Sequence, residues 1–125
     1  MIRAIHHATF LSDDLARSRA FYEGVLGLQA DPSRPAMAFD GVWYRLHSEQ
    51  QIHLMSLPNP PTDSQRPVHG GRDRHLALAV GDLAALMARL AGAGIPYTLS
   101  RSGRRALFCR DPDGNALEFI ETAGI

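Results

Sequence analysis

The chain has 125 residues, of which 45% are hydrophobic, so it is long enough for one compact core and too short for two independent domains. Its 13 basic and 13 acidic residues cancel, and they form no tail of one sign, which argues against nucleic acid or a membrane surface as a partner. All the basic residues are arginines. Lysine chemistry is therefore excluded, whereas binding of a carboxylate or phosphate by arginine is not.

The cysteine and apolar content favour a reducing compartment. Cys109 is the only cysteine and cannot form an internal disulfide, and no apolar run is long enough for a signal or membrane segment. We therefore expect a cytoplasmic protein. Cys109 is expected to be structural, because only the neighbouring Arg110 could activate its thiol.

The first half of the chain predicts a strand, a helix and three further strands. Residues 3–11 alternate as a strand does, and residues 12–14 offer cap oxygens for a helix that ends at Gly27. Short strands are then expected over residues 37–39, 42–46 and 51–56.

The second half predicts the same order of elements. A strand over residues 75–80 precedes a helix that begins after Asp82 and ends at Gly94. Residues 111–115 form a turn, in which Gly114 takes a positive φ. The remaining strands are expected over residues 97–100, 105–109 and 116–121.

An internal repeat relates the two halves. The segment that His7 opens recurs from His75, and an Asp-Leu pair follows each histidine at the same spacing. Residues 1–57 and 75–125 are therefore predicted to be two copies of one module within a single domain. Residues 58–74, rich in proline and glycine, are predicted to be the linker.

The repeat also aligns potential metal ligands. An ungapped match of the segments that begin at Trp43 and Phe108 places His53 opposite Glu118. Each copy thus carries two residues of types that bind metals, at equivalent positions. Glu118 lies in the middle of an apolar strand, where a carboxylate is costly unless it is paired or bound to a metal.

Strand alternation predicts which way these side chains point. His75 shares a face with Ala77 and Ala79, whose small size leaves room beside it. Neighbours on a strand face opposite ways, so the doublet His6-His7 is ambiguous alone; the repeat selects His7, and Thr9 then lies on the same face.

Three segments give the chain a family resemblance: HHATFLSDDLARSRAFYEGVLGL at the start, RHLALAV in the middle and DPDGNALEFIE near the end. The chain resembles the vicinal oxygen chelate superfamily, which includes glyoxalase I, fosfomycin-resistance enzymes, methylmalonyl-CoA epimerase, extradiol dioxygenases and bleomycin-binding proteins. The resemblance implies an α+β fold of two βαβββ modules, whose sheets curve around a cup that binds a divalent metal.

The resemblance also implies the ligands of one divalent ion, which could be Zn, Ni, Mn or Fe. His7, His75 and Glu118 fall on the family's ligand positions. His53 falls where glyoxalase I-like members have a carboxylate or amide, so it is either a fourth ligand or an acid-base group beside the metal. Glu118, His53 and Thr9 are the candidate catalytic residues.

The expected activity is that of a glyoxalase-like lyase or isomerase, acting on a small substrate that chelates the metal through vicinal oxygens. The alternatives are a fosfomycin-type thiol transferase, for which Thr9 is the matching residue, an extradiol dioxygenase, and a metal-free protein that binds a bleomycin-type antibiotic. Members of the resembling families commonly pair two chains, so we expect a homodimer.

Other polar residues have weaker claims to function. His47 and His69 lie in turn or linker sequence and are expected to be solvated. Arg101, Arg104 and Arg105 either steer an anionic or thiol-conjugated substrate or form a solvated loop.

Overall fold

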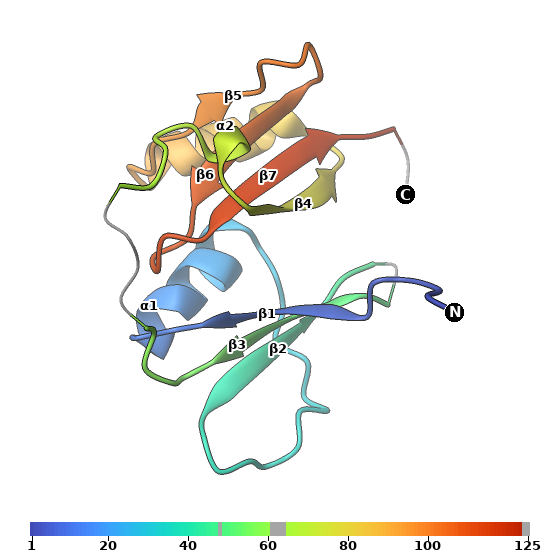
Figure 1. Ribbon diagram of the computed structural model, residues 1–125, viewed down its shortest axis with the longest axis vertical. Coiled ribbons are helices and arrows are strands. Elements are labelled where there is room, and N and C mark those ends of the chain that lie inside the picture. Colours follow the sequence, from blue (N-terminus) through green and yellow to red (C-terminus); the bar gives the residue numbers. More distant parts are fainter. Residues whose placement is uncertain (48, 61–64, 124–125) are drawn as a thin grey trace. The chain divides into compact units, whose positions relative to one another are not determined.

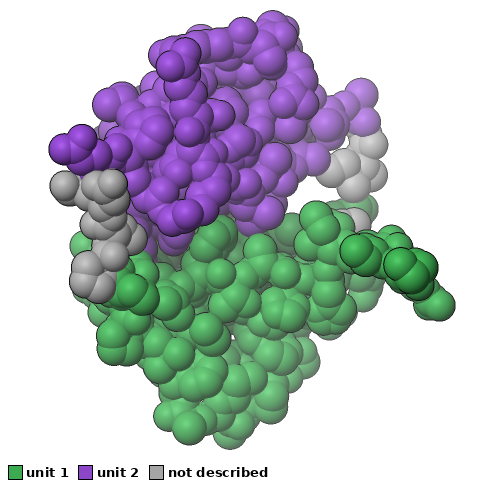
Figure 2. Space-filling view, in the orientation of Figure 1, with its two compact units in different colours: residues 1–60 green, residues 61–125 purple. Residues whose placement is uncertain are grey.

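The structure is a computed structural model that describes residues 1–47, 49–60 and 65–123. The chain divides into two compact units, Met1–Pro60 and Pro61–Ile125 (Figure 2). Each unit has its own mixed sheet and its own helical segment, so the predicted α+β class is confirmed. Among the described residues, no helix is long and apolar enough to cross a membrane.

Unit 1 contains a three-stranded sheet (Figure 1). Strand β3 (Gln51–Met55) lies in the centre, parallel to β1 (His7–Leu11) and antiparallel to β2 (Gly41–Arg45). Helix α1 (Leu15–Arg19) continues directly into the π-helix η1 (Ala20–Val25). The helical segment therefore leads from β1 to β2 at the opposite edge of the sheet, and the hairpin of β2 and β3 brings β3 between them, parallel to β1.

The helical segment of unit 1 begins and ends where the sequence predicts. The Asp14 side chain caps α1 by accepting a hydrogen bond from the backbone N–H of Arg17, and Gly27 follows η1 with a φ of 77°. Tyr22 stacks on Tyr44 of β2 with ring centroids 5.8 Å apart, and both rings are fully buried. This aromatic pair joins the helix to the sheet.

The strand expected over residues 37–39 does not form. Arg34 donates a hydrogen bond to the carbonyl of Phe39, so that carbonyl is not available to a sheet. Ala30 makes an isolated bridge to Tyr44 instead. Alternation over three residues is too short a pattern to specify a strand when a side chain can bind the same backbone.

Unit 2 contains a four-stranded sheet in the order β4-β7-β6-β5 (Figure 1). The parallel pair consists of β4 (His75–Val80) and β7 (Ala116–Glu121), and the antiparallel strands are β6 (Ala106–Arg110) and β5 (Thr98–Leu99). Helix α2 (Leu83–Gly92) connects β4 to β5, and a short 3-10 helix, η2 (Gly70–Arg72), precedes β4.

The core of unit 2 lies between α2 and the sheet. Asp82 caps α2 through the backbone N–H of Ala85, and Glu121 of β7 accepts a hydrogen bond from the first helical N–H, that of Leu83. The helix buries Leu83, Leu86 and Leu90, and β6 and β7 bury all their apolar side chains except that of Ile120, which is half-buried. The positive φ expected at Gly114 is observed at 85°.

Candidate functional site

The two units place their candidate ligands in the same register. In unit 1, His53 of β3 lies opposite Thr9 of β1, two residues beyond His7. In unit 2, Glu118 of β7 lies opposite Ala77 of β4, two residues beyond His75. The parallel ladders of the two units therefore support the equivalence of His53 and Glu118 that the sequence repeat predicts.

An aromatic residue occupies the equivalent position on the other side of each ligand. Trp43 of β2 pairs with His53, and Phe108 of β6 pairs with Glu118. These two aromatics are the residues that begin the ungapped match in the sequence. The repeat thus extends beyond the ligands to the rings beside them.

In unit 1 the exposed face of the sheet carries a stack of three rings. The imidazole of His53 stacks on that of His7 with centroids 4.2 Å apart, and on the indole of Trp43 with centroids 4.3 Å apart. Because β3 lies between β1 and β2, His53 is the middle ring of the stack. His6 Nδ1 lies 2.8 Å from His7 Nδ1, so one of these two nitrogens donates to the other. Thr9 is exposed on the same face as His7.

The environment of His53 keeps its imidazole neutral. Burial is the largest cause, followed by the nearby charges of His7, His6 and Arg34, and together they lower the pKa of His53 to about 4. Its Nε2 lies 2.7 Å from Gln51 Oε1, which can only accept a hydrogen bond. Nε2 of the neutral ring therefore carries the proton, and the lone pair is on Nδ1.

This pKa predicts a pH dependence of stability for the metal-free protein. The pKa of His53 is lower in the folded state than the usual value near 6.5, so the unfolded chain binds more protons as the pH falls. With respect to this group, the free energy of unfolding has its full value above about pH 6.5. It falls by about 2 kcal/mol as the pH is lowered to about 4, after allowance for solvent screening. Urea unfolding of His53→Gln should lack this loss, whereas His47→Gln, at an exposed histidine, should retain it.

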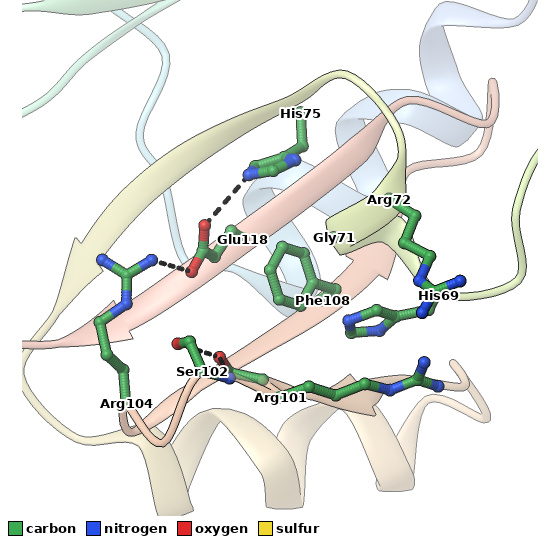
Figure 3. A pocket seen from close by; sticks show the side chains of 10 residues that line it. His69, Gly71, Arg72, His75, Arg101, Ser102, Arg104, Phe108 and Glu118 are labelled. Carbon is green, nitrogen blue, oxygen red and sulfur yellow. Dashed lines mark hydrogen bonds and ion pairs between the residues drawn. The ribbon is translucent and has the colours of Figure 1, made fainter.

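In unit 2 the buried carboxylate of Glu118 lies between an imidazole, that of His75, and a guanidinium, that of Arg104. Its Oε1 is 3.2 Å from His75 Nε2, and its Oε2 is 3.4 Å from Arg104 Nη2 (Figure 3). The Glu118 side chain is only 3% exposed, whereas that of Arg104 is 59% exposed. An exposed guanidinium therefore supplies a cationic partner for this buried carboxylate.

A hydrogen bond to the backbone orients His75. Its Nδ1 lies 2.8 Å from the carbonyl oxygen of Asp73, an acceptor, so Nδ1 carries a proton and Nε2 faces Glu118. The Asp73 carboxylate is itself held by Arg66 at 2.6 Å and by Arg110 at 2.9 Å. Burial raises the pKa of Asp73. The hydrogen bonds from Arg110 and the Arg74 amide, together with the nearby arginine charges, lower it by more than burial raises it, so the carboxylate stays ionised.

We expect Arg110→Ala to destabilise the protein and to loosen His75. Arg110 also donates hydrogen bonds to the carbonyls of Pro67 and Gly114, so its loss removes several contacts around a nearly buried carboxylate. The expected loss is about 3 kcal/mol in urea unfolding. Arg105→Ala is the matched control. The Arg105 side chain, which pairs with Glu121, is 65% exposed, so the expected loss is about 1 kcal/mol or less. Imidazole ¹⁵N shifts should show a mixed His75 tautomer only in Arg110→Ala.

A cavity of about 340 Å³ lies beside this group, within unit 2 (Figure 3). Glu118 and His75 line it together with Phe108 and a set of basic residues. One of these, His69, was expected to be solvated but is buried. Its Nδ1 lies 2.7 Å from Thr98 Oγ1, and its ring packs edge-on against Phe108.

One feature of the sequence is consistent with the buried position of His69, namely the two glycines that follow it. A Cβ atom on Gly71 would lie 2.7 Å from His69 Nε2, so only glycine leaves room for the ring. Cys109, in contrast, has the structural role that was expected. Its thiol is buried, and burial raises its pKa to about 12.

The structure therefore brings the predicted ligands together in two pairs, His7 with His53 in unit 1 and His75 with Glu118 in unit 2. Within residues 1–47, 49–60 and 65–123, no group of three or more His, Cys, Asp or Glu side chains gathers as a complete metal site. The four-residue ligand set and the catalytic roles of Thr9, His53 and Glu118 remain predictions.

Comparison with known proteins identifies the family. Residues 4–119 match the family model of the Glyoxalase/Bleomycin resistance protein/Dioxygenase superfamily. The uncharacterized protein YaeR of Escherichia coli (strain K12) is 35% identical, over 96% of this chain and 97% of YaeR. The uncharacterized protein YwkD of Bacillus subtilis (strain 168) is 33% identical, over 97% of this chain and 98% of YwkD.

Solved structures agree with this match. Lactoylglutathione lyase from Agrobacterium tumefaciens is similar with a TM-score of 0.65 and 25% identity, over 94% of this chain and 92% of the lyase. At lower identity, the fold is shared with the fosfomycin resistance protein FosX from Listeria monocytogenes (TM-score 0.75, 16% identity, 96% of this chain and 91% of FosX). It is also shared with TnmS3, an antibiotic binding protein from Streptomyces sp. CB03234 (TM-score 0.72, 20% identity, 98% of each chain). The chain therefore belongs to the Glyoxalase/Bleomycin resistance protein/Dioxygenase superfamily.

Proposed function

We propose that this protein is a metal-dependent lyase or isomerase of the glyoxalase type. It binds one divalent ion through His7, His75, Glu118 and His53, and it acts on a small molecule that reaches the ion through two adjacent oxygens. Members of the superfamily often use a divalent metal and bind small molecules, and the similarity to a lactoylglutathione lyase supports this reaction class.

The contact between His75 and Glu118 is the observation that carries the proposal. Since Nδ1 of His75 donates to a carbonyl, its Nε2 is the nitrogen that faces Oε1 of the carboxylate, at 3.2 Å. Such a contact needs a proton or a cation to be favourable. Two donors about 2.1 Å from one metal, at tetrahedral or octahedral angles, are about 3.0–3.4 Å apart. The observed distance fits a shared metal ion.

The pair in unit 1 supports the same ion by its chemistry. The pKa of His53 leaves its imidazole neutral at neutral pH, which is the form that binds a metal, and His7 shares its exposed face. When bound, a divalent ion supplies a Lewis acid that stabilises negative charge developing on a substrate oxygen.

The residues of the chain provide the remaining steps. Glu118 accepts the proton that the substrate loses and returns it to the neighbouring atom; His53 takes this role through Nδ1 only if that nitrogen is not bound to the ion. Arg104 limits the movement of Glu118 through their ion pair. The hydroxyl of Thr9, opposite His53 on the exposed face, can donate a hydrogen bond to the substrate.

Metal analysis and turnover test this proposal directly. Purified protein should contain about one divalent ion per chain, and turnover should follow the metal content. The substrates to compare are methylglyoxal with glutathione, fosfomycin with a thiol, and catechols, each with Zn, Ni, Mn and Fe. Protein without affinity for any divalent ion would reject the proposal and favour the alternative of a metal-free protein that binds an antibiotic.

A fosfomycin-type thiol transferase is the second candidate, because Thr9 lies on the same face as His7 and His53. The fold similarity to FosX is compatible with it. Turnover of fosfomycin and a thiol without turnover of the methylglyoxal adduct would select this candidate, and ring opening of a catechol would select a dioxygenase.

We further propose that the protein is a cytoplasmic homodimer. Superfamily members often dimerise, and the buried free thiol of Cys109 suits a reducing compartment. We expect light scattering at micromolar concentration to give twice the mass of the chain. A monomer with full metal content would contradict the dimer.

A further inference from the structure

The cavity in unit 2 has one end that the proposed metal chemistry does not use. Its volume of about 340 Å³ falls within the range of sites for small molecules. Glu118 and His75 lie at one side of the view in Figure 3, and His69, Arg72 and Arg101 lie at the other. The ring of Phe108 lies between them. We call the part lined by His69, Arg72 and Arg101 the basic end.

The cavity as a whole has an excess of positive charge. Three guanidinium groups line the cavity against a single carboxylate, that of Glu118, which already binds Arg104 and His75. Most arginines in this part of unit 2 form ion pairs: Arg66, Arg104, Arg105 and Arg110 each bind a carboxylate. In the part of the chain that the structure describes, no ion pair is recorded for Arg72 or Arg101.

His69 lines the same end of the cavity as Arg72 and Arg101. Burial is the largest cause of the lowered pKa of His69, and the charges of Arg101 and then Arg72 follow. The ring is held at Nδ1 by Thr98, which directs Nε2 toward Gly71. Because Gly71 has no side chain, no Cβ atom fills the space beside that nitrogen. A neutral ring that accepts at Nδ1 can donate at Nε2.

We propose that the basic end binds an oxyanion, a carboxylate or phosphate group, between the guanidinium groups of Arg72 and Arg101, with His69 as a further donor. Planar guanidinium groups suit both kinds of oxyanion, since each can donate two parallel hydrogen bonds. Because the proposal rests on the proposed function for the reacting end, it names a substrate class: a small organic acid or phosphate ester. Its anion lies beside Arg72 and Arg101, its body packs on Phe108, and its adjacent oxygens reach the metal ion that Glu118 is proposed to bind.

The test measures anion binding without metal or turnover, so that its failure can be told from failure of the metal proposal. The full chain, freed of metal with a chelator, is titrated with inorganic phosphate and separately with acetate at constant ionic strength in chloride. Amide ¹H–¹⁵N shifts report the site and the affinity. The variants are Arg72→Gln and Arg101→Gln, with Arg17→Gln as the matched control, an exposed arginine of unit 1 for which no side-chain partner is recorded.

We expect the largest shifts at Gly71, Arg72, Arg101 and Ser102, and an affinity at least about tenfold weaker in each of the two pocket variants. Arg17→Gln should bind as the unaltered protein does. Binding of phosphate alone would assign a phosphate ester, and binding of acetate would assign a carboxylate. Equal affinity in all the variants, or shifts centred elsewhere, would overturn the proposal.

A second pair of variants keeps the test valid if a glutamine variant does not fold. Arg72→Lys and Arg101→Lys retain the charge and lose the planar fork, so they should bind the anion more weakly than arginine and more tightly than glutamine. Gly71→Ala, which would crowd His69 Nε2, should weaken binding with both arginines intact. Normal binding by Gly71→Ala would count against the role of His69 as a donor.

Discussion

Glu118→Gln should weaken metal binding by more than about 100-fold, because loss of residues that only support a ligand already costs about 10- to 100-fold. Glutamine keeps the shape of the side chain and can still contact Arg104 and His75, so the fold should persist. It lacks the negative charge that compensates a divalent ion. Competition with a fluorescent chelator measures the affinity, and turnover should fall by at least the same factor.

Glu121→Gln is the matched control for this variant. Glu121 lies on the same strand and also pairs with an arginine, Arg105, but it faces α2 and not the cavity. It should lose a little stability and keep its metal. If Glu118→Gln binds metal as tightly as the unaltered protein, Glu118 is not a ligand and its buried charge serves only His75 and Arg104.

The features that the sequence predicts well are those that depend on local chemistry or on the repeat. Asp14 and Asp82 cap helices because a carboxylate beside free backbone N–H groups does so in many contexts. The register of His53 and Glu118 follows from an ungapped match, since a slip of one residue would turn every side chain to the other face.

The features that the sequence did not predict depend on contacts between distant residues. The apolar residues of the π-helix η1 have a spacing that also suits an α-helix, so the sequence does not distinguish the two kinds of helix. His69 is buried because Thr98 and Phe108 receive it, and neither is near it in the sequence. The orientation of His75 likewise depends on Arg110, through Asp73.

Replacement of His53 separates its two possible roles. His53→Ala should lower metal affinity by about 10- to 100-fold or more if the imidazole is a ligand. If it is instead the acid-base group, metal affinity should hold and turnover should fall by about two orders of magnitude. Its place in the middle of the ring stack, with a free Nδ1 lone pair, is compatible with both roles.

The controls for this variant use the neighbouring rings. His47→Ala removes an exposed histidine and should change neither property. Fluorescence of Trp43, whose indole stacks on His53, shows whether the sheet of unit 1 is intact after the change. Should His53→Ala keep both its metal and its activity, the equivalence of His53 and Glu118 would be structural only. The site would then have the three ligands His7, His75 and Glu118, and the proton transfer would fall to Glu118, because no other acid-base group occupies an equivalent position in the repeat.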